Sequence, residues 1–241
     1  MNPNLSEITL LLDRSGSMHT IREATIDGFN TFLESQQKSP GLVRLTLVQF
    51  DHQQLVTHDS LPVAEVLPLD LDTFVPRGST ALLDAIGDTI ERLGQRFKAM
   101  PEGQRPGDVT VVILTDGQEN SSRRFTWNQV SDRIQHQIDH YNWQFLYLGA
   151  DADTIATASK LNIRADHSAS YHGHSEGVKA VYSSMSRKVS GTRSVRHGIA
   201  TDVETSDAQA SMSDLLNEEE RKHRGEDASG AEPRPDDSQS S

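Results

Sequence analysis

Two short and almost wholly apolar runs, at residues 8–12 and 109–114, constrain the fold of this chain more than any other feature. Unbroken apolar runs that include β-branched residues are typical of strands covered on both faces in a parallel sheet. An aspartate follows each run, as Asp13 and as Asp116. Because ligands of open α/β sheets bind outside the carboxyl ends of the strands, these two carboxylates are predicted to flank a binding site.

Further strands are expected from the same kind of pattern. Residues 43–50 and 143–148 are rich in apolar and β-branched side chains. Residues 53–58 follow the first of these segments after a two-residue turn. Because so short a turn joins only antiparallel strands, this strand is predicted to pair antiparallel at an edge of the sheet. A short strand near residues 163–166 would close the sheet.

The segments between the strands carry apolar residues at helical spacing. Strands that alternate with helices predict a doubly wound, mostly parallel α/β sheet with one antiparallel edge strand. A shorter helix at residues 151–161 and a final helix at residues 175–189 are also expected. Three longer stripes are expected to pack on the sheet: Ile21, Thr25, Phe29 and Phe32; Leu82, Ile86, Ile90, Leu93 and Phe97; Trp127, Val130, Ile134, Ile138 and Tyr141.

The periodic pattern stops near residue 190, which divides the chain into an expected domain at residues 1–190 and an acidic tail at residues 191–241. Residues 200–241 hold 12 acidic and 4 basic side chains. A segment with few large apolar residues cannot bury enough surface to offset its chain entropy, so the tail is expected to be disordered. Residues 211–216 are interpreted as a featureless linker, with a transient helical turn that docks on a partner as the alternative.

Composition and charge exclude several functional classes. The net charge of −12 disfavours nucleic-acid binding. The basic residues at 187–188 and 193–196 are interpreted as a solvated helix end. The chain has no cysteine, which removes disulfides and thiolate chemistry and fits a reducing compartment. No leader-like or membrane-spanning segment is expected near the N-terminus, because the first apolar run is too short. The sequence therefore predicts a cytoplasmic protein without membrane contact.

Five oxygen-bearing side chains follow or precede the expected strands and helices: Asp13, Ser15, Ser17, Thr80 and Asp116. Carboxylate and hydroxyl oxygens suit a hard divalent cation such as Mg²⁺, which takes one or two carboxylates together with other oxygen ligands. The set contains no thiolate and no imidazole, which argues against Zn²⁺ or Cu²⁺. The sequence therefore predicts a site for Mg²⁺ or Mn²⁺ at these five residues.

The arrangement D-x-S-x-S, then Thr80, then Thr115-Asp116-Gly117, resembles the metal-ion-dependent adhesion site (MIDAS) of von Willebrand factor A (vWA) domains. The similarity extends over residues 8–189, and its motifs are most similar to those of stand-alone, intracellular vWA proteins of bacteria. The resemblance implies that Ser15, Ser17 and Thr80 bind the metal through their hydroxyls, and that Asp13 and Asp116 act largely through water. It also implies that an Asp or Glu of a partner protein takes the remaining position, in assembly or regulation of a complex.

Other interpretations of the same residues stay open at this stage. Each of Ser15, Ser17 and Thr80 taken alone suits a helix cap as well as a ligand. Asp84 and Glu119 are either support for the site or, as the preferred interpretation, solvated carboxylates. The alternative function is a Mg²⁺-dependent hydrolase or phosphotransferase that uses the same oxygens.

An enzyme is the less favoured hypothesis, because the common nucleophile and phosphate-binding motifs are absent from the sequence. A serine nucleophile would need a base, for which His19 is the candidate near in sequence. An exported adhesin is disfavoured by the lack of a leader-like segment. The expected protein is thus a non-enzymatic module that binds another protein through its metal.

Overall fold

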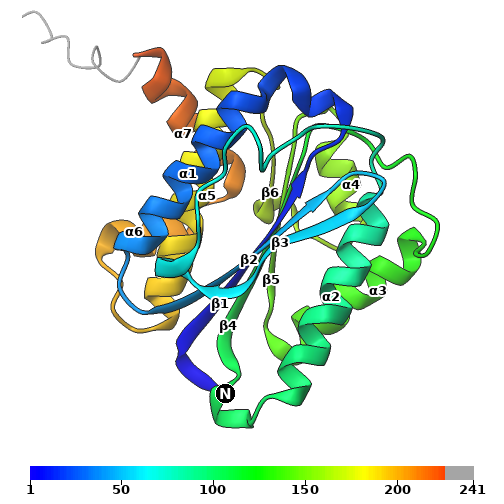
Figure 1. The fold of residues 1–241 in the computed structure, drawn as a ribbon. Helices are drawn as coiled ribbons and strands as arrows, with labels where there is room; N and C mark the ends of the chain where they lie inside the picture. The colour runs from blue at the N-terminus through cyan, green and yellow to red at the C-terminus, as the bar shows by residue number, and fades with distance from the viewer. Residues whose placement is uncertain (226–241) are drawn as a thin grey trace, which may run out of the picture.

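The structure is a computed structural model that describes residues 1–225, and it consists of a six-stranded sheet between two layers of helices (Figure 1). The strand order is β3-β2-β1-β4-β5-β6, and all neighbours are parallel except β2 and β3. The predicted doubly wound, mostly parallel sheet with one antiparallel edge strand is confirmed. The strands are β1 (Asn2–Asp13), β2 (Leu42–Phe50), β3 (Gln54–Pro62), β4 (Pro106–Thr115), β5 (Gln144–Gly149) and β6 (Ser168–Ser170).

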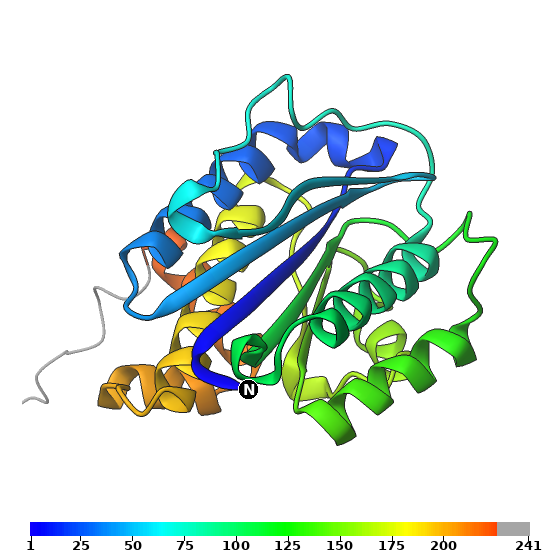
Figure 2. The same cartoon turned by 60° about the horizontal axis from the view of Figure 1, so that its bottom comes forward.

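The helices divide between the two faces of the sheet, as Figures 1 and 2 show from two sides. One layer holds α1 (Arg22–Lys38), α5 (Ser175–Arg196), α6 (Asp202–Gln209) and α7 (Met212–Arg224). The other layer holds α2 (Leu82–Ala99), α3 (Trp127–Tyr141) and α4 (Thr154–Lys160). Short 3₁₀ turns occur at η1 (Gly16–Ile21), η2 (Val63–Glu65), η3 (Glu102–Gln104) and η4 (Ala165–His167).

Successive side chains along the central strands point to opposite faces of the sheet, and this divides the core into two layers. Leu10 and Leu12 of β1 lie in the cluster beneath α1 and α5. Leu11 lies in the opposite cluster, with the apolar residues of α2 and α3. All three side chains are fully buried, as expected of a central strand covered on both faces. The apolar run that predicted β1 therefore supplies both layers of the core.

The last strand lies later in the sequence than expected. Residues 163–166 were predicted to be a strand, but Ile163 donates its backbone N–H to Ala158 and so belongs to the end of α4. A 3₁₀ turn follows, and β6 pairs with β5 only over Ser168–Ser170. Ile163 is apolar because it is buried beneath α4, and not because it pairs in the sheet.

The expected boundary at residue 190 is wrong for residues 191–225. Helix α5 runs through this position to Arg196, and α6 and α7 follow it. Met212, Leu215 and Leu216 are at most 3% exposed, and Met212 and Leu216 belong to the core cluster beneath α1 and α5. The segment at residues 211–216 is thus neither a linker nor a free turn. The expectation of disorder for residues 226–241 lies outside the described residues.

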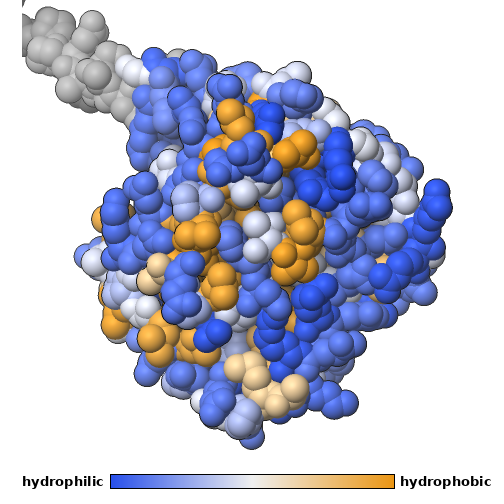
Figure 3. Space-filling view, in the orientation of Figure 1, coloured by the Kyte–Doolittle hydropathy of each residue, from blue (hydrophilic) through white to orange (hydrophobic). Residues whose placement is uncertain are grey.

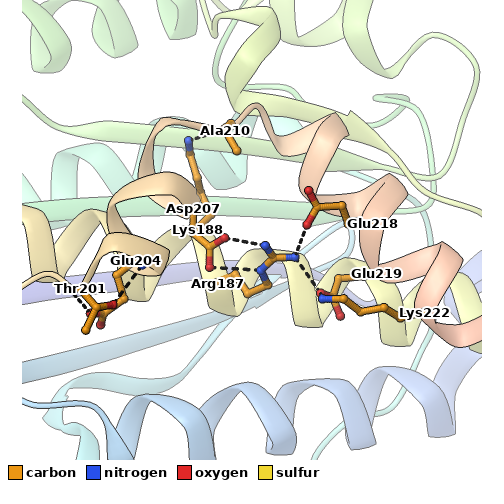
Figure 4. Close-up of polar contacts among 9 residues, drawn as sticks. All are labelled: Arg187, Lys188, Thr201, Glu204, Asp207, Ala210, Glu218, Glu219 and Lys222. Carbon is orange, nitrogen blue, oxygen red and sulfur yellow. Dashed lines mark hydrogen bonds and ion pairs between the residues drawn. The ribbon is translucent and has the colours of Figure 1, made fainter. Parts of the chain in front are cut away.

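Charged groups hold the C-terminal helices to α5 (Figure 4). Arg187 contacts Asp207 of α6 at 2.5 Å and both Glu218 and Glu219 of α7 at 2.9 Å. The hydrogen bonds that Arg187 donates to Asp207, and those to Glu218 and Glu219, raise the pKa of Arg187 above its ordinary value. Lys188 donates to the backbone carbonyls of Ala208 and Ala210. Of the basic residues interpreted as a solvated helix end, Arg187 and Lys188 therefore anchor α6 and α7. Arg193 instead donates to Gln36 and to the carbonyl of Pro40, and Arg196 pairs with Asp108, so these residues are not a solvated end either.

Gly191 of α5 is required by the close approach of α6. A Cβ atom at this position would lie 2.5 Å from the carbonyl oxygen of Glu204 and 3.0 Å from the backbone nitrogen of Ala208. The two backbones therefore touch where a larger residue would separate them.

The face of the molecule drawn in Figure 3 is mainly polar. On the face drawn in Figure 3, hydrophobic residues form separate small groups between hydrophilic ones. Among the described helices, none combines the length and the apolarity that crossing a bilayer requires.

Candidate metal centre

The predicted site residues lie at the carboxyl edge of the sheet. Strands β1 and β4 are direct neighbours, with Leu12 opposite Leu114. Asp13 ends β1 and Asp116 follows β4, so the strand pairing brings the two aspartates to the same edge. Met18 is fully buried and anchors the 3₁₀ turn η1, which carries Ser17.

The three hydroxyl groups converge on one point. A Cβ atom built on Gly117 would lie 3.2 Å from Oγ1 of Thr80, 3.6 Å from Oγ of Ser17 and 3.8 Å from Oγ of Ser15. Oγ of Ser15 is 3.1 Å from Oγ of Ser17, and the Ser17 hydroxyl donates to Oδ1 of Asp116 at 2.6 Å. Glycine at position 117 therefore leaves open a space that is surrounded by oxygen atoms.

Asp13 is fixed beneath this space. Its Oδ1 accepts a hydrogen bond of 2.7 Å from the backbone N–H of Ser15, and its Oδ2 accepts one of 2.5 Å from the hydroxyl of Thr115. The Asp13 side chain is fully buried. Thr115 was not among the predicted residues, and its role is to orient the carboxylate of Asp13.

Both carboxylates carry a negative charge that burial destabilises. Burial raises the pKa of Asp13 to about 6, against the hydrogen bonds from Thr115 and Ser15, and the charge of Asp116 adds to the rise. Burial also raises the pKa of Asp116, against its hydrogen bond from Ser17. Neither carboxylate forms an ion pair with any of residues 1–225. A bound cation would supply the missing countercharge.

The alternative that these hydroxyls serve only as helix caps does not match the geometry. The side chain of Ser15 makes no capping hydrogen bond to η1, and Ala81 is the N-cap residue of α2, without a side-chain cap. The first turn of α2 is instead satisfied by Glu119, which accepts from the N–H of Leu83 at 2.9 Å. The Thr80 hydroxyl makes no hydrogen bond with any described residue.

Asp84 and Glu119 are structural residues, and the interpretation of both as solvated carboxylates is wrong. Glu119 accepts from the backbone N–H groups of Ser121 and Ser122 as well as from Leu83. Asp84 accepts from three successive backbone N–H groups, at residues 123–125. Together they fix the loop that carries Asp116 against the start of α2.

Asn120 holds Thr80 in place. Oδ1 of Asn120 accepts from the N–H of Thr80 at 2.9 Å, and the N–H of Asn120 donates to the carbonyl of Thr80 at 3.0 Å. This pair of bonds joins the loop after β4 to the residue before α2. Asn120 was not among the predicted site residues.

Asp51 joins three loops of the site and was missed. It follows β2 and is fully buried. Its Oδ2 lies 3.0 Å from Nε of Arg14 and accepts a hydrogen bond of 2.9 Å from Nε of Arg77. The Asp51 carbonyl accepts from the N–H of Ala81 at 2.9 Å. The signal was present in the sequence, because Asp51 directly follows an apolar strand, as Asp13 does.

The donor set fits a hard divalent cation. Within the described part of the chain no group of three or more His, Cys, Asp or Glu residues is arranged to hold a metal. The centre combines two carboxylates with three hydroxyls, which is an all-oxygen set of the kind that Mg²⁺ and Mn²⁺ prefer. Ser17 is exposed, so the space beside the hydroxyls is accessible from solvent.

Comparison with known proteins shows that this chain is similar in fold to solved structures. No family model matches the chain, and no curated protein matches it. The solved structure of a von Willebrand factor type A protein from Catenulispora acidiphila gives a TM-score of 0.51 at 17% identity, over 79% of this chain and 43% of that chain. The structure of proximal thread matrix protein 1 from the mussel byssus, with a zinc-occupied MIDAS motif, gives a TM-score of 0.53 at 14% identity, over 78% of this chain and 47% of that chain.

The chain therefore spans less than half the length of each of these two proteins. At these identities the similarity concerns the fold alone. The fold of the described residues is of the vWA type.

Proposed function

We propose that this chain is a vWA module that holds Mg²⁺, or Mn²⁺, at Asp13, Ser15, Ser17, Thr80 and Asp116 and thereby binds an acidic residue of a partner protein. The observation that carries the proposal is the convergence of three hydroxyls on the open space at Gly117, beside the buried carboxylate of Asp13 and the half-buried carboxylate of Asp116, neither of which has a countercharge among the described residues. The zinc-occupied MIDAS motif of the mussel protein supports a divalent metal in a related fold.

Each residue has a distinct part in this proposal. Ser15, Ser17 and Thr80 would hold the ion through neutral hydroxyl oxygens, while Asp13 and Asp116 would balance its charge from behind. The ion would supply a positive charge that the neutral hydroxyls leave largely uncompensated, which attracts a carboxylate. Thr115 and Asn120 orient Asp13 and Thr80, and Asp51 holds the loops together.

A non-enzymatic role fits the geometry better than hydrolysis or phosphotransfer. A serine nucleophile needs a base within hydrogen-bond reach. Within residues 1–225, no hydrogen bond joins His19 to Ser15 or Ser17, and the His19 side chain is exposed. We propose a role in the assembly or regulation of a complex, and the resemblance of the motifs to those of intracellular, stand-alone bacterial vWA proteins supports a cytoplasmic, bacterial protein as part of this proposal.

The test is capture of a partner from a lysate on the immobilised full chain. The wild type in Mg²⁺ is expected to retain a partner that is lost in EDTA and lost with Thr80→Ala. Thr126→Ala is the matched control, because Thr126 is an exposed threonine that caps α3 and lies outside the site.

Three further outcomes decide between the hypotheses. Replacement of one Asp or Glu of the captured partner by its amide should abolish retention. Retention that is equal in Mg²⁺, in EDTA and with Thr80→Ala would contradict binding through the metal. Metal-dependent turnover of p-nitrophenyl phosphate that Thr80→Ala abolishes would favour the hydrolase.

A further inference from the structure

A second cavity lies at the opposite edge of the sheet from the metal centre. It has a volume of about 450 Å³ and is formed by the C-terminal parts of α2 and α3, the first residues of β4 and Trp143, which directly precedes β5. Figure 2 shows the ends of these two helices side by side at this edge. Volumes of this size and a largely apolar lining are typical of small-molecule sites.

Aromatic side chains form much of the wall. Phe97 of α2 and Trp143 meet edge to face, with ring centroids 5.8 Å apart. Tyr141, at the end of α3, also lines the cavity and is 48% exposed. The indole N–H of Trp143 makes no hydrogen bond with any described residue. The cavity thus offers flat apolar surfaces and an unused donor to a planar ligand.

Gly94 of α2 keeps this cavity open. A Cβ atom at Gly94 would have no heavy atom within 4 Å, whereas one at Gly87 of the same helix would lie 2.6 Å from the ring of Phe125. Packing therefore requires glycine at position 87 but not at position 94. Because glycine destabilises a helix interior relative to alanine, Gly94 costs stability without a packing reason. A larger side chain there would extend into the space that Gly94 lines.

The charged residues that line the cavity are basic, although the chain as a whole is acidic. Lys98, Arg105 and His136 line it, and no Asp or Glu among the described residues does so. Lys98 forms no ion pair with any of residues 1–225, and Arg105 is held in place by its hydrogen bond to the carbonyl of Met100. The net charge of the whole chain is −12. A cationic rim around an apolar cavity is complementary to an amphipathic anion.

We propose that this cavity is a binding site for a small aromatic carboxylate, with the ring against Phe97 and Trp143 and the carboxylate near Lys98. The site is independent of the metal centre, since its residues lie at the amino-terminal ends of β4 and β5 and the metal-site residues lie at the carboxyl ends.

The test is titration of the full chain with 2-naphthoate, followed through the indole N–H resonances in ¹⁵N-labelled protein. The chain has two tryptophans, and Trp127→Phe assigns their signals. Saturable movement of the Trp143 resonance, with that of Trp127 unmoved, is expected. Gly94→Leu should weaken binding about tenfold or more by filling the cavity, while Gly94→Ala, measured in parallel, reports the effect of helix propensity alone. Both variants should melt no earlier than the wild type.

The charge is tested with the neutral analogue 2-naphthamide. Lys98→Glu should weaken 2-naphthoate about threefold and leave 2-naphthamide unchanged. Absence of a saturable Trp143 shift, or an undiminished shift in Gly94→Leu, would overturn the site. Equal affinity for naphthoate and naphthamide would overturn the choice of an anion. A Trp143 resonance that moves with protein concentration alone would show that a second copy of the chain fills the cavity. That result would also overturn the proposed small-molecule site.

Discussion

Replacement of Arg187 by methionine tests whether the C-terminal helices belong to the domain. Arg187 is the common partner of Asp207, Glu218 and Glu219, and the side chains of Asp207 and Glu219 are 10% and 11% exposed. Removal of one partner of a buried ion pair costs about 3–5 kcal/mol. Glu219 keeps its contact with Lys222 at 2.7 Å, and Arg187 itself is 25% exposed. The expected loss is therefore smaller, about 2–3 kcal/mol of unfolding free energy.

Urea unfolding followed by circular dichroism measures this loss, and Arg164→Met provides the comparison. Arg164 makes a two-bond contact with Asp166 at the surface, where its side chain is 75% exposed. An exposed pair contributes about 1 kcal/mol at most. Equal losses in the two variants would refute the reasoning, because the cost of Arg187→Met depends on buried carboxylates.

A second variant separates lost charge from lost packing. Asp207→Leu combined with Arg187→Met removes both members of the Arg187–Asp207 pair, while Glu219 keeps Lys222 as a partner. Apolar replacement of a whole buried pair is often neutral. The double variant should therefore lose less than the sum of the two single variants. Limited proteolysis gives an independent readout: residues 191–225 should be resistant in the wild type and cut early in Arg187→Met.

Three further predictions concern other parts of the chain. Burial raises the pKa of Glu7 above its ordinary value, against the hydrogen bonds that it accepts from Ser60 and Thr46. The folded wild type therefore loses stability as pH rises and the Glu7 carboxyl loses its proton, whereas the neutral amide of Glu7→Gln does not titrate. In EDTA, the melting temperature of Glu7→Gln relative to the wild type should increase from pH 4 to pH 8, and a difference that does not change with pH would contradict this. Gly191→Ala should lower the unfolding free energy by about 1–3 kcal/mol by forcing α6 from α5, whereas Gly94→Ala should not lower it. Asp51→Asn should weaken Mg²⁺ binding about tenfold or more in calorimetry, because Asp51 holds the loops that carry Ser15 and Thr80.

The sheet and the placement of the candidate site residues followed from local patterns in the sequence. The apolar runs identified β1 and β4, and the order of strands and helices placed Asp13 and Asp116 at one edge. The short turn after β2 identified β3 as the antiparallel edge strand. These features depend on residues that are near in sequence, so a single chain reveals them.

The remaining features depend on contacts between distant residues. Helices α6 and α7 carry few apolar side chains, and Arg187, Lys188 and the close approach at Gly191 hold them to α5 in addition to the buried apolar residues of α7. Composition alone therefore predicted a tail. Thr115 was missed for the same reason, because its partner Asp13 is far away in the sequence. The position of Asp51 after a strand was visible in the sequence, but its contact with the distant Arg77 was not. Thr80 differs from a helix-capping threonine because its hydroxyl makes no hydrogen bond with any described residue, and a sequence pattern does not reveal this.

Mn²⁺ binding, measured by the electron paramagnetic resonance signal of the free ion, tests the metal centre most directly. The wild type and Thr126→Ala should each bind one Mn²⁺ per chain, which Mg²⁺ displaces. Thr80→Ala and Asp13→Asn should bind about tenfold more weakly or worse, because a small octahedral ion tolerates the loss of an oxygen poorly. Binding of equal strength in the wild type, Thr80→Ala and Asp13→Asn would contradict the assignment of the metal to these residues.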